Sequence, residues 1–399
     1  MHLLKCTFKC IALLLLLATT TQAQKKFNNW YFGFHAGISF NTPTPTLLPP
    51  TTMDQFEGCA AISDNTGALL FYTDGITVWD KNNNAMPNGT GLGGSRSTTQ
   101  SSLIVPMPGD DEKYYLFTME DETRSGDLRY SIVDMSLNAG NGDIIPGAKN
   151  IFLSTNNTEA LVAANPTNCN TWVLTHQRDN NRFEARLVTH SGIGTPVPSN
   201  VGAIHNSVGN FPVFPTNIIG LMKVSRNNQK IAVATAGRLE ELFDFDPGTG
   251  QVSNPISLPI TAPNLGYGIC FSPDDSKVYV SEAAGSQGNG YNIFQFDLSG
   301  GNAATIINSK TLLGLVQAPL AVAGDLQVAP DDKIYFTRPM ISYLGVIPFP
   351  DLKAPQCGFI NNGISLGTAV SYWGLPNQIR AGNRVPKIRL GNDTILCPG

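Results

Sequence analysis

An internal repeat between residues 56 and 350 constrains the fold of this chain more than any other feature. Each copy contains a short strand, a polar turn, a strand of alternating β-branched or aromatic residues, a variable loop and a further strand that commonly ends at Asp. The equivalent positions Ser225, Ser272 and Ala329 are 47 and 57 residues apart. The clearest copies are 224–246, 271–297 and 328–347, and weaker copies are 62–80, 105–134 and 165–187. A repeat of this length predicts one structural unit that occurs six times.

Each copy has the residue pattern of half-buried strands joined by tight turns. The segment Lys277–Ser281 alternates as such a strand does, and Pro273–Asp275 before it supplies the fixed φ and the Asx hydrogen bond that a turn needs. No stretch after the N-terminal leader has a helical period of ten or more residues. The pattern therefore predicts an all-β protein.

Repeated four-stranded sheets favour a β-propeller. One such sheet cannot bury both of its faces, whereas copies stacked around an axis can. An up-and-down sandwich or a β-solenoid is the alternative, but repeats of this length are too long for a solenoid coil.

The two ends of the repeat region predict how the ring closes. Residues Trp30–Phe40 are strand-like and precede the first full copy, while Gly363–Leu366 and Tyr372–Gly374 follow the last. Joined as one composite blade, these ends would hide the open edges of the ring. We therefore expect seven blades, with six or eight as alternatives. Two polar stretches, 41–52 and 87–99, are expected to be long surface loops.

Residues 1–23 have the three-part form of a secretory signal peptide. Lys5 and Lys9 precede the apolar stretch Ile11–Ala18, and the small residue Ala23 stands at the expected cleavage site. Eight apolar residues are far fewer than the roughly 20 that a membrane-spanning helix needs. We expect an exported chain with no membrane span.

The charge of the chain argues against nucleic acid as a partner. It carries 26 Lys and Arg residues against 30 Asp and Glu, a net charge of −4, and no basic run. Only 14% of its residues are charged, which suits the Asn-, Gly- and Thr-rich loops of a repeated β-structure.

The domain boundaries follow from these features. The propeller is expected over 24–379, and 380–399 is expected to be a linker and the first strand of a further sandwich domain that is cut short. Five cysteines follow the leader: Cys59, Cys169, Cys270, Cys357 and Cys397. Cys397 would find its partner in the missing part of that domain, and Cys270 is expected to be buried in a strand. Pairing among the other cysteines stays open, and their spacing does not predict a zinc site.

Several segments resemble a known family. The segments 28–33, 56–64, 70–80 and 374–377 are similar to the N-terminal propeller region of large exported proteins of the Bacteroidota. Those proteins are cargo of the type IX secretion system and are described as gliding-motility-associated or surface-adhesion proteins. Residues 390–397 resemble the opening of the immunoglobulin-like or PKD-like domains that follow in that family. The resemblance implies a C-terminal sorting domain for export and surface attachment, and O-glycosylation at Thr394 within Asp393–Ile395.

No residue pattern commits the chain to a reaction. The histidines His35, His176, His190 and His205 are scattered, and a lone His176 at a strand end is more typical of an ordinary polar residue than of a site. Most acidic residues stand where turns are expected, although a glycosidase could be built from two carboxyls across a cleft. The acidic groups are Asp110–Glu112, Glu120–Glu122, Glu240–Glu241, Asp244, Asp246, Asp274–Asp275 and Asp331–Asp332.

Two further patterns have a structural explanation that we favour. Residues 244–250 half-resemble a calcium loop but lack its acidic end ligand, so a strand end followed by a turn is expected. The aromatic residues Trp30, Tyr31, Trp79, Trp172 and Trp373 could stack on sugars, but each lies in an apolar strand and is expected in the core.

The sequence therefore predicts a non-catalytic interaction or adhesion module of a secreted, cell-surface protein, which binds an extracellular protein or glycan through propeller loops. No catalytic, cofactor-binding or metal-binding residue is assigned, and the ligand is unknown. The alternative is a propeller enzyme that acts on extracellular polysaccharide with loop carboxylates.

The predicted leader can be tested on the secreted protein. N-terminal sequencing is expected to begin at Gln24, because signal peptidase cleaves after a small residue such as Ala23. A secreted chain that still contains residues 1–23 would contradict this prediction.

Overall fold

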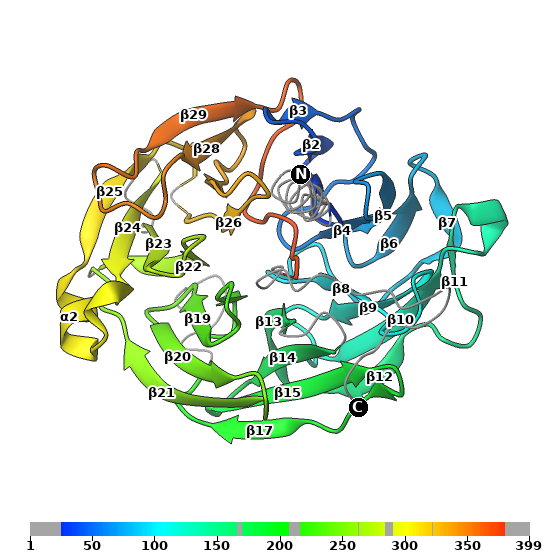
Figure 1. The fold of residues 1–399 in the computed structure, drawn as a ribbon, viewed down its shortest axis with the longest axis horizontal. Coiled ribbons are helices and arrows are strands. Elements are labelled where there is room, and N and C mark those ends of the chain that lie inside the picture. Colours follow the sequence, from blue (N-terminus) through cyan, green and yellow to red (C-terminus); the bar gives the residue numbers. More distant parts are fainter. Residues whose placement is uncertain are drawn as a thin grey trace, which may run out of the picture.

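Seven antiparallel sheets form a ring around a central channel (Figure 1). The computed structural model describes residues 25–165, 170–206, 216–261, 263–283, 290–320 and 322–379. The all-β propeller prediction is confirmed, and so is the number of seven blades. The predicted leader, Cys169, and the tail 380–399 with Thr394 and Cys397 lie outside the described residues.

Within each blade the strands follow one another outward from the channel (Figure 1). The first blade has three strands: β1 (Asn29–Phe32), β2 (Ala36–Ser39) and β3 (Thr46–Leu47). The second and third blades are β4 (Ala60–Ser63), β5 (Leu69–Thr73), β6 (Thr77–Asp80) and β7 (Ala85–Thr90), then β8 (Ser102–Pro106), β9 (Lys113–Met119), β10 (Leu128–Asp134), β11 (Asp143–Ile144) and β12 (Ile151–Ser154). The fourth blade is β13 (Asn157–Ala164), β14 (Thr171–Gln177), β15 (Arg182–Thr189), β16 (Gly192–Ile193) and β17 (Val197–Asn200).

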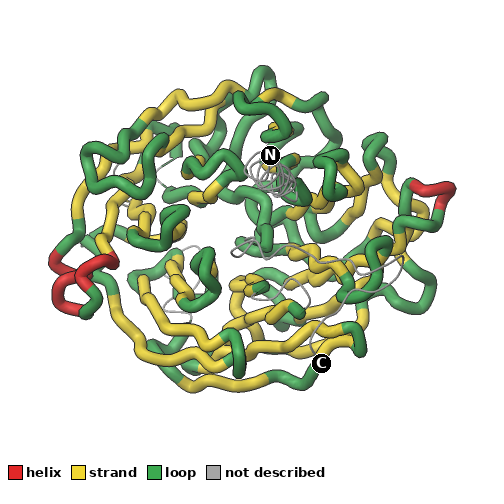
Figure 2. Tube along the Cα trace, in the orientation of Figure 1, coloured by secondary structure: helices red, strands yellow, loops and turns green. Residues whose placement is uncertain are grey.

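The remaining blades are regular four-stranded sheets. They are β18 (Gly220–Val224), β19 (Lys230–Thr235), β20 (Glu240–Asp246) and β21 (Gln251–Ser257); β22 (Leu265–Phe271), β23 (Lys277–Ala283), β24 (Tyr291–Asp297) and β25 (Thr311–Val316); and β26 (Leu326–Val328), β27 (Ile334–Phe336), β28 (Tyr343–Ile347) and β29 (Ile360–Ser365). Short helices occur at the periphery (Figure 2): η1 (Asn138–Gly140), η3 (Leu298–Gly300) and α2 (Ala303–Asn308).

The three clearest sequence copies share one turn geometry. Asn228, Asp275 and Asp332 occupy the same position of the turn between the first two strands of their blades, with φ of 58°, 62° and 59°. Each donates its backbone N–H to the carbonyl three residues earlier, at distances of 3.0–3.1 Å. Asn and Asp tolerate this left-handed conformation better than other non-glycine residues. The repeat in the sequence is therefore a repeat of turn chemistry.

Aromatic and aliphatic side chains fill the space between neighbouring blades. Trp30, Tyr31 and Trp172 are buried, as expected, and Trp79 and Trp373 are partly buried. Cys270 is buried in β22, as predicted. Cys59 and Cys357 are buried free thiols.

The C-terminal segment 366–379 closes the ring. It returns from β29 to the channel (Figure 1) and lies between the innermost strands of the last and second blades. The backbone N–H of Trp373 donates to the Phe56 carbonyl at 2.9 Å. The Trp373 carbonyl accepts from the backbone N–H of Asp325 at 2.8 Å. Val370 also forms a bridge with Phe34 of the first blade. The two ends thus meet beside the first blade, as expected, but residues 363–365 are part of β29 in the last blade and do not join the N-terminal strands in one sheet.

The loop predictions need correction in two places. The stretch 41–52 contains the short strand β3, and 87–99 begins inside β7, which ends at Thr90. Both strands are outermost in their sheets, where pairing on one side alone is enough to form a strand from a polar sequence.

The channel contains side chains that pair with the free edges of the innermost strands. The Gln100 amide donates to the Met222 carbonyl at 3.1 Å, and its oxygen accepts from the N–H groups of Leu161 and Met222 at 3.0 Å each. The Asn377 amide donates to the carbonyls of Ser102 and Leu161 at 3.1 and 2.7 Å. These two side chains join β8, β13 and β18 to the C-terminal segment.

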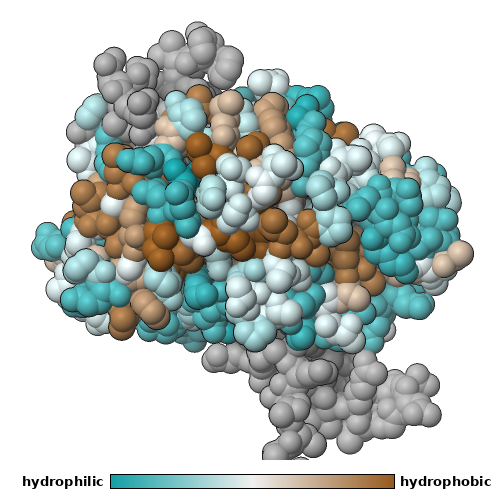
Figure 3. Space-filling view, turned by 90° about the horizontal axis from the view of Figure 1, so that it is seen from above, coloured by the Kyte–Doolittle hydropathy of each residue, from teal (hydrophilic) through white to brown (hydrophobic). Residues whose placement is uncertain are grey.

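Apolar side chains are exposed on the outer rim of the ring. Figure 3 views the ring from its edge and shows apolar residues gathered there between hydrophilic patches. Exposed residues of the outermost strands include Leu47, Leu315 and Ile360. In the described part of the chain, we find no helix with the length and apolar character needed to cross a membrane.

Replacing Gln100 by Ala tests the role of the channel amides. The substitution removes three hydrogen bonds to backbone groups and leaves those groups without partners, so the free energy of unfolding should fall by about 2–5 kcal/mol. Chemical denaturation measures this value. Replacing the exposed Gln229 by Ala is the matched control and should change it by less than about 0.5 kcal/mol. Equal effects of the two substitutions would contradict the proposed role.

Candidate functional site

One mouth of the channel gathers acidic side chains from several blades. Three of them come from the start of the innermost strand of their blade or from the residues just before it. Glu57 precedes β4, Glu159 lies in β13 and Tyr267 lies in β22. The loop between β9 and β10 brings Glu122 to the same place, since the Glu122 N–H donates to Glu159. We call Glu57, Glu122, Glu159 and Tyr267 the mouth cluster.

Glu159 is the most firmly held member of the mouth cluster. Its carboxyl accepts from the Thr99 N–H at 2.8 Å, the Thr99 hydroxyl at 2.7 Å and the Glu122 N–H at 2.8 Å. Burial nevertheless raises its pKa well above the ordinary value, and the neighbouring Glu122 and Glu57 raise it further. Its oxygens are therefore already occupied within the protein.

Glu57 and Tyr267 differ from Glu159 because they have polar atoms without partners. The Glu57 side chain is buried, and its Oε2 has no hydrogen-bond partner among the described residues. Burial raises the pKa of Glu57, the charges of Glu122 and Asp121 add to this, and the nearby Tyr267 hydroxyl opposes it. Burial also raises the pKa of Tyr267, whose hydroxyl lies beside the Glu57 carboxyl. Such orphaned buried groups are uncommon and call for an explanation.

A buried arginine positions the loop that delivers Glu122. The Arg178 guanidinium donates to the carbonyls of Asn157 at 2.6 Å, Arg124 at 2.8 Å and Asp121 at 2.9 Å. A fourth bond reaches the Glu122 carbonyl at 3.2 Å. Arg178 therefore stabilises loop backbone, and it forms no ion pair with the mouth cluster.

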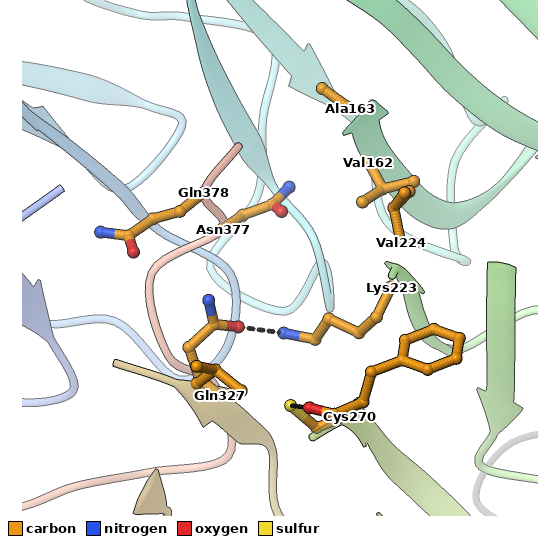
Figure 4. A pocket seen from close by; sticks show the side chains of 10 residues that line it. Val162, Ala163, Lys223, Val224, Cys270, Gln327, Asn377 and Gln378 are labelled. Carbon is orange, nitrogen blue, oxygen red and sulfur yellow. Dashed lines mark hydrogen bonds between the residues drawn. The ribbon is translucent and has the colours of Figure 1, made fainter. Parts of the chain in front are cut away.

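Below the mouth, a pocket in the channel is lined by polar groups that are satisfied (Figure 4). Its cavity volume is about 20 Å³. Lys223 Nζ donates to Gln327 Oε1 at 2.7 Å and lies 3.2 Å from Asp325 Oδ1. Burial raises the pKa of Asp325, while Lys223 opposes the rise. Because its polar groups pair with one another, this pocket serves the ring's own structure.

The other acidic residues lie in turns or inside a strand, away from the mouth cluster. Asp110, Asp246, Asp274 and Asp331 each accept the backbone N–H two residues later, at 2.8–3.3 Å. Their interpretation as turn residues is confirmed, as is the strand end followed by a turn at 244–250. Glu240 and Glu241 instead lie inside β20 and are buried. Among the described residues, no three His, Cys, Asp or Glu side chains are arranged to hold a metal ion.

His176 lies near the end of β14, as the sequence favours, and its side chain is buried. Its ring stacks on His205 with 3.7 Å between centroids. Burial lowers the pKa of His176 to about 4. Burial and the neighbouring His176 lower that of His205 as well. Both rings are therefore neutral at pH 7.

Sequence reasoning singled out Glu122 but missed Glu57, Glu159 and Tyr267. Their shared signal is position, since each stands just before or near the start of an innermost strand. That signal becomes visible once the innermost strands are assigned.

No family model and no curated protein sequence matches the chain. Among solved structures, it is similar to the Dos1 propeller, with 11% identity over 87% of this chain and 86% of that one and a TM-score of 0.48. It is also similar to the Myceliophteria thermophila Cps50 (Swd1) β-propeller domain, with 10% identity, coverage of 78% and 94%, and a TM-score of 0.45. A functionally unknown protein from Desulfotomaculum acetoxidans gives 13% identity, coverage of 88% and 98%, and a TM-score of 0.45. These likenesses carry no argument about function.

The raised pKa of Glu57 predicts a pH dependence of stability. The folded state keeps this proton at pH values where the unfolded state, with a pKa near 4.5, has lost it. The free energy of unfolding should therefore fall as pH rises above about 4.5, by up to about 1.4 kcal/mol per pH unit, until the folded-state pKa is passed.

Replacing Glu57 by Gln should flatten this dependence, because the amide does not ionise. Urea denaturation between pH 5 and 8 measures it. Replacing the exposed Glu112 by Gln should leave the slope unchanged. An unaltered slope in the Glu57→Gln variant would show that Glu57 ionises normally.

Proposed function

We propose that this chain is a non-catalytic interaction module of an exported, cell-surface protein, which binds an extracellular protein or glycan through the loops around the mouth cluster. The propeller fold is in keeping with an interaction module in general. The observation that carries the proposal is the mouth cluster itself, where the buried side chains of Glu57, Glu159 and Tyr267 converge from three blades. Polar groups that converge from several elements are typical of binding sites.

The leader and the family resemblance support the proposed location. The segment 1–23 is a signal peptide in form, and the resemblance to type IX secretion cargo implies delivery to the cell surface through a C-terminal domain. In that setting the rigid ring would hold the mouth loops in fixed positions, so that a partner is bound at a small loss of conformational entropy.

An enzyme that acts on extracellular polysaccharide is the second candidate. A glycosidase needs two carboxyl groups roughly 5–10 Å apart, with the acid kept protonated. The mouth brings Glu57, Glu122 and Glu159 together, and burial raises the pKa of Glu57 and Glu159. Because the oxygens of Glu159 are held by three donors, Glu57 and Glu122 would have to act as the pair.

A glycan array combined with a reducing-sugar assay separates the two candidates. The interaction module should bind without releasing sugar, and replacing Glu122 by Gln should weaken binding at least about fivefold, because a carboxyl at the contact surface is lost. The exposed Glu112→Gln substitution is the control and should leave binding unchanged. Sugar release that disappears in the Glu122→Gln variant would instead establish the enzyme.

A further inference from the structure

Two buried histidines stack on each other beside the β14–β15 turn of the fourth blade. His176 lies near the end of β14, and His205 follows β17 in the chain. Their ring centroids are 3.7 Å apart, and the ring planes differ by 21°. Each residue is 1% exposed, and the Phe183 ring lies across that of His176 at 4.6 Å. The protein therefore encloses the pair.

The hydrogen bonding of His176 fixes where a further proton would bind. Its Nδ1 lies 2.8 Å from the Gln177 carbonyl oxygen. A carbonyl oxygen can only accept, so Nδ1 carries the hydrogen and Nε2 keeps a lone pair. Nε2 of His176 and Nε2 of His205 have no hydrogen-bond partner among the described residues. A proton bound at Nε2 of His176 would therefore create a buried N–H without an acceptor.

Burial and the stacking itself also oppose protonation. Burial disfavours the charged imidazolium and lowers the pKa of His176 to about 4. Burial lowers the pKa of His205 as well, and the charge that His176 would carry lowers it further. The folded arrangement therefore accommodates the two rings only while they are neutral.

The charged groups on the elements around the pair are engaged elsewhere. Arg182 and Arg186 both pair with Glu184, at 3.1 and 2.8 Å. The Arg178 guanidinium donates to backbone carbonyls, and no ion pair of the described residues includes either ring. The titratable and charged groups on these elements are Arg178 and Asp179 on the β14–β15 turn, Arg182, Glu184 and Arg186 on β15, and Glu241 on β20.

Glu241 responds to acid in the opposite sense from the histidine pair. Its two carboxyl oxygens accept from the Ala203 N–H at 3.3 and 3.2 Å. Burial raises the pKa of Glu241, so the folded state keeps a proton there at pH values where the unfolded state has lost it. Acid therefore favours the folded state at Glu241, whereas it favours the unfolded state at the two histidines, whose pKa values are lowered.

Backbone hydrogen bonds beside the rings tie the segment 201–206 to the β14–β15 turn. The Asp179 N–H donates to the His205 carbonyl at 2.7 Å, and the His205 N–H donates to the Asn180 carbonyl at 3.0 Å. One ring of the pair belongs to β14 and the other to the segment 201–206. Separation of the rings would therefore pull on these backbone bonds.

We propose that the stacked pair of His176 and His205 is an acid-sensitive latch, which holds the segment 201–206 against the β14–β15 turn at neutral pH and releases it when the rings are protonated. The same turn carries Arg178, whose guanidinium holds the β9–β10 loop that delivers Glu122 to the mouth cluster. Release would therefore loosen a loop at the mouth. The latch requires no ligand, and only its effect on binding rests on the proposed function.

Hydrogen exchange measured by mass spectrometry on the full chain tests the latch. Exchange in 178–182 and 201–206 is followed at pH 7, 6 and 5 and corrected for the intrinsic effect of pH. A ring with a pKa of about 4 when closed and about 6.5 when released should raise the opening equilibrium about twentyfold between pH 7 and pH 5. His205 should add to this effect. Protection in β23, residues 277–283, should not fall in parallel.

Substitutions identify the groups responsible. The double variant His176→Phe, His205→Phe keeps two stacked rings that cannot be protonated, so it should lose the pH response and stay protected at pH 5. Glu241→Gln keeps an acceptor for Ala203 and should leave the response in place. His190→Phe, at the exposed turn after β15, is the matched control and should also leave it in place. If the double variant does not fold, His205→Phe alone should reduce the response about tenfold or more.

Three results would overturn the latch. They are equal protection of 178–182 and 201–206 at pH 7 and pH 5, a pH response that persists in the variants without His205, and a loss of protection that spreads equally over all blades. Each would leave the proposed binding role intact, because exchange is measured without a ligand. Absence of binding on the glycan array would instead weaken the proposed function and leave the latch in place.

Discussion

The ring depends on how the inner edges of its innermost strands are satisfied. These edges face the channel, where no further strand can pair with them, and buried backbone groups without partners are costly. Gln100 supplies both a donor and an acceptor to β13 and β18, and Asn377 supplies donors to β8 and β13. Two amide side chains thus replace part of a missing strand.

The same constraint explains how the ring closes. Asn377 and Trp373 belong to the C-terminal segment, which also bonds to the backbone of the second and last blades through Phe56 and Asp325. The side chains that line the channel and the segment that closes the ring are therefore one structural unit. This segment also packs against the backbone of Glu57, where the contacts at Gly58 and Gly374 are close.

The candidate site is defined by a difference in ion pairing between the interior of the channel and its mouth. Inside the channel, Lys223 pairs with Asp325 and donates to Gln327, and Asn377 donates to the Leu161 carbonyl. At the mouth, burial raises the pKa of Glu57 and leaves one of its oxygens without a partner. A buried carboxyl that is costly to the folded protein calls for an explanation other than stability.

Much of the fold could be predicted because it depends on local chemistry. The turns at Asn228, Asp275 and Asp332 adopt the left-handed conformation that their side chains favour, and alternating residues between these turns form the strands. The candidate site could not be predicted in the same way. Glu57, Glu159 and Tyr267 are far apart along the chain and share no motif, so only the stacking of blades brings them together.

The amino-acid sequence by itself determined the repeated strand-and-turn unit, the composition of the core and the all-β class, because each depends on residues that are neighbours in the chain. Only the tertiary structure decided which acidic residues serve turns and which meet at the channel mouth. The reason is that the desolvation and mutual repulsion of the mouth carboxyls arise from burial between blades, and burial is a property of the closed ring rather than of any one segment.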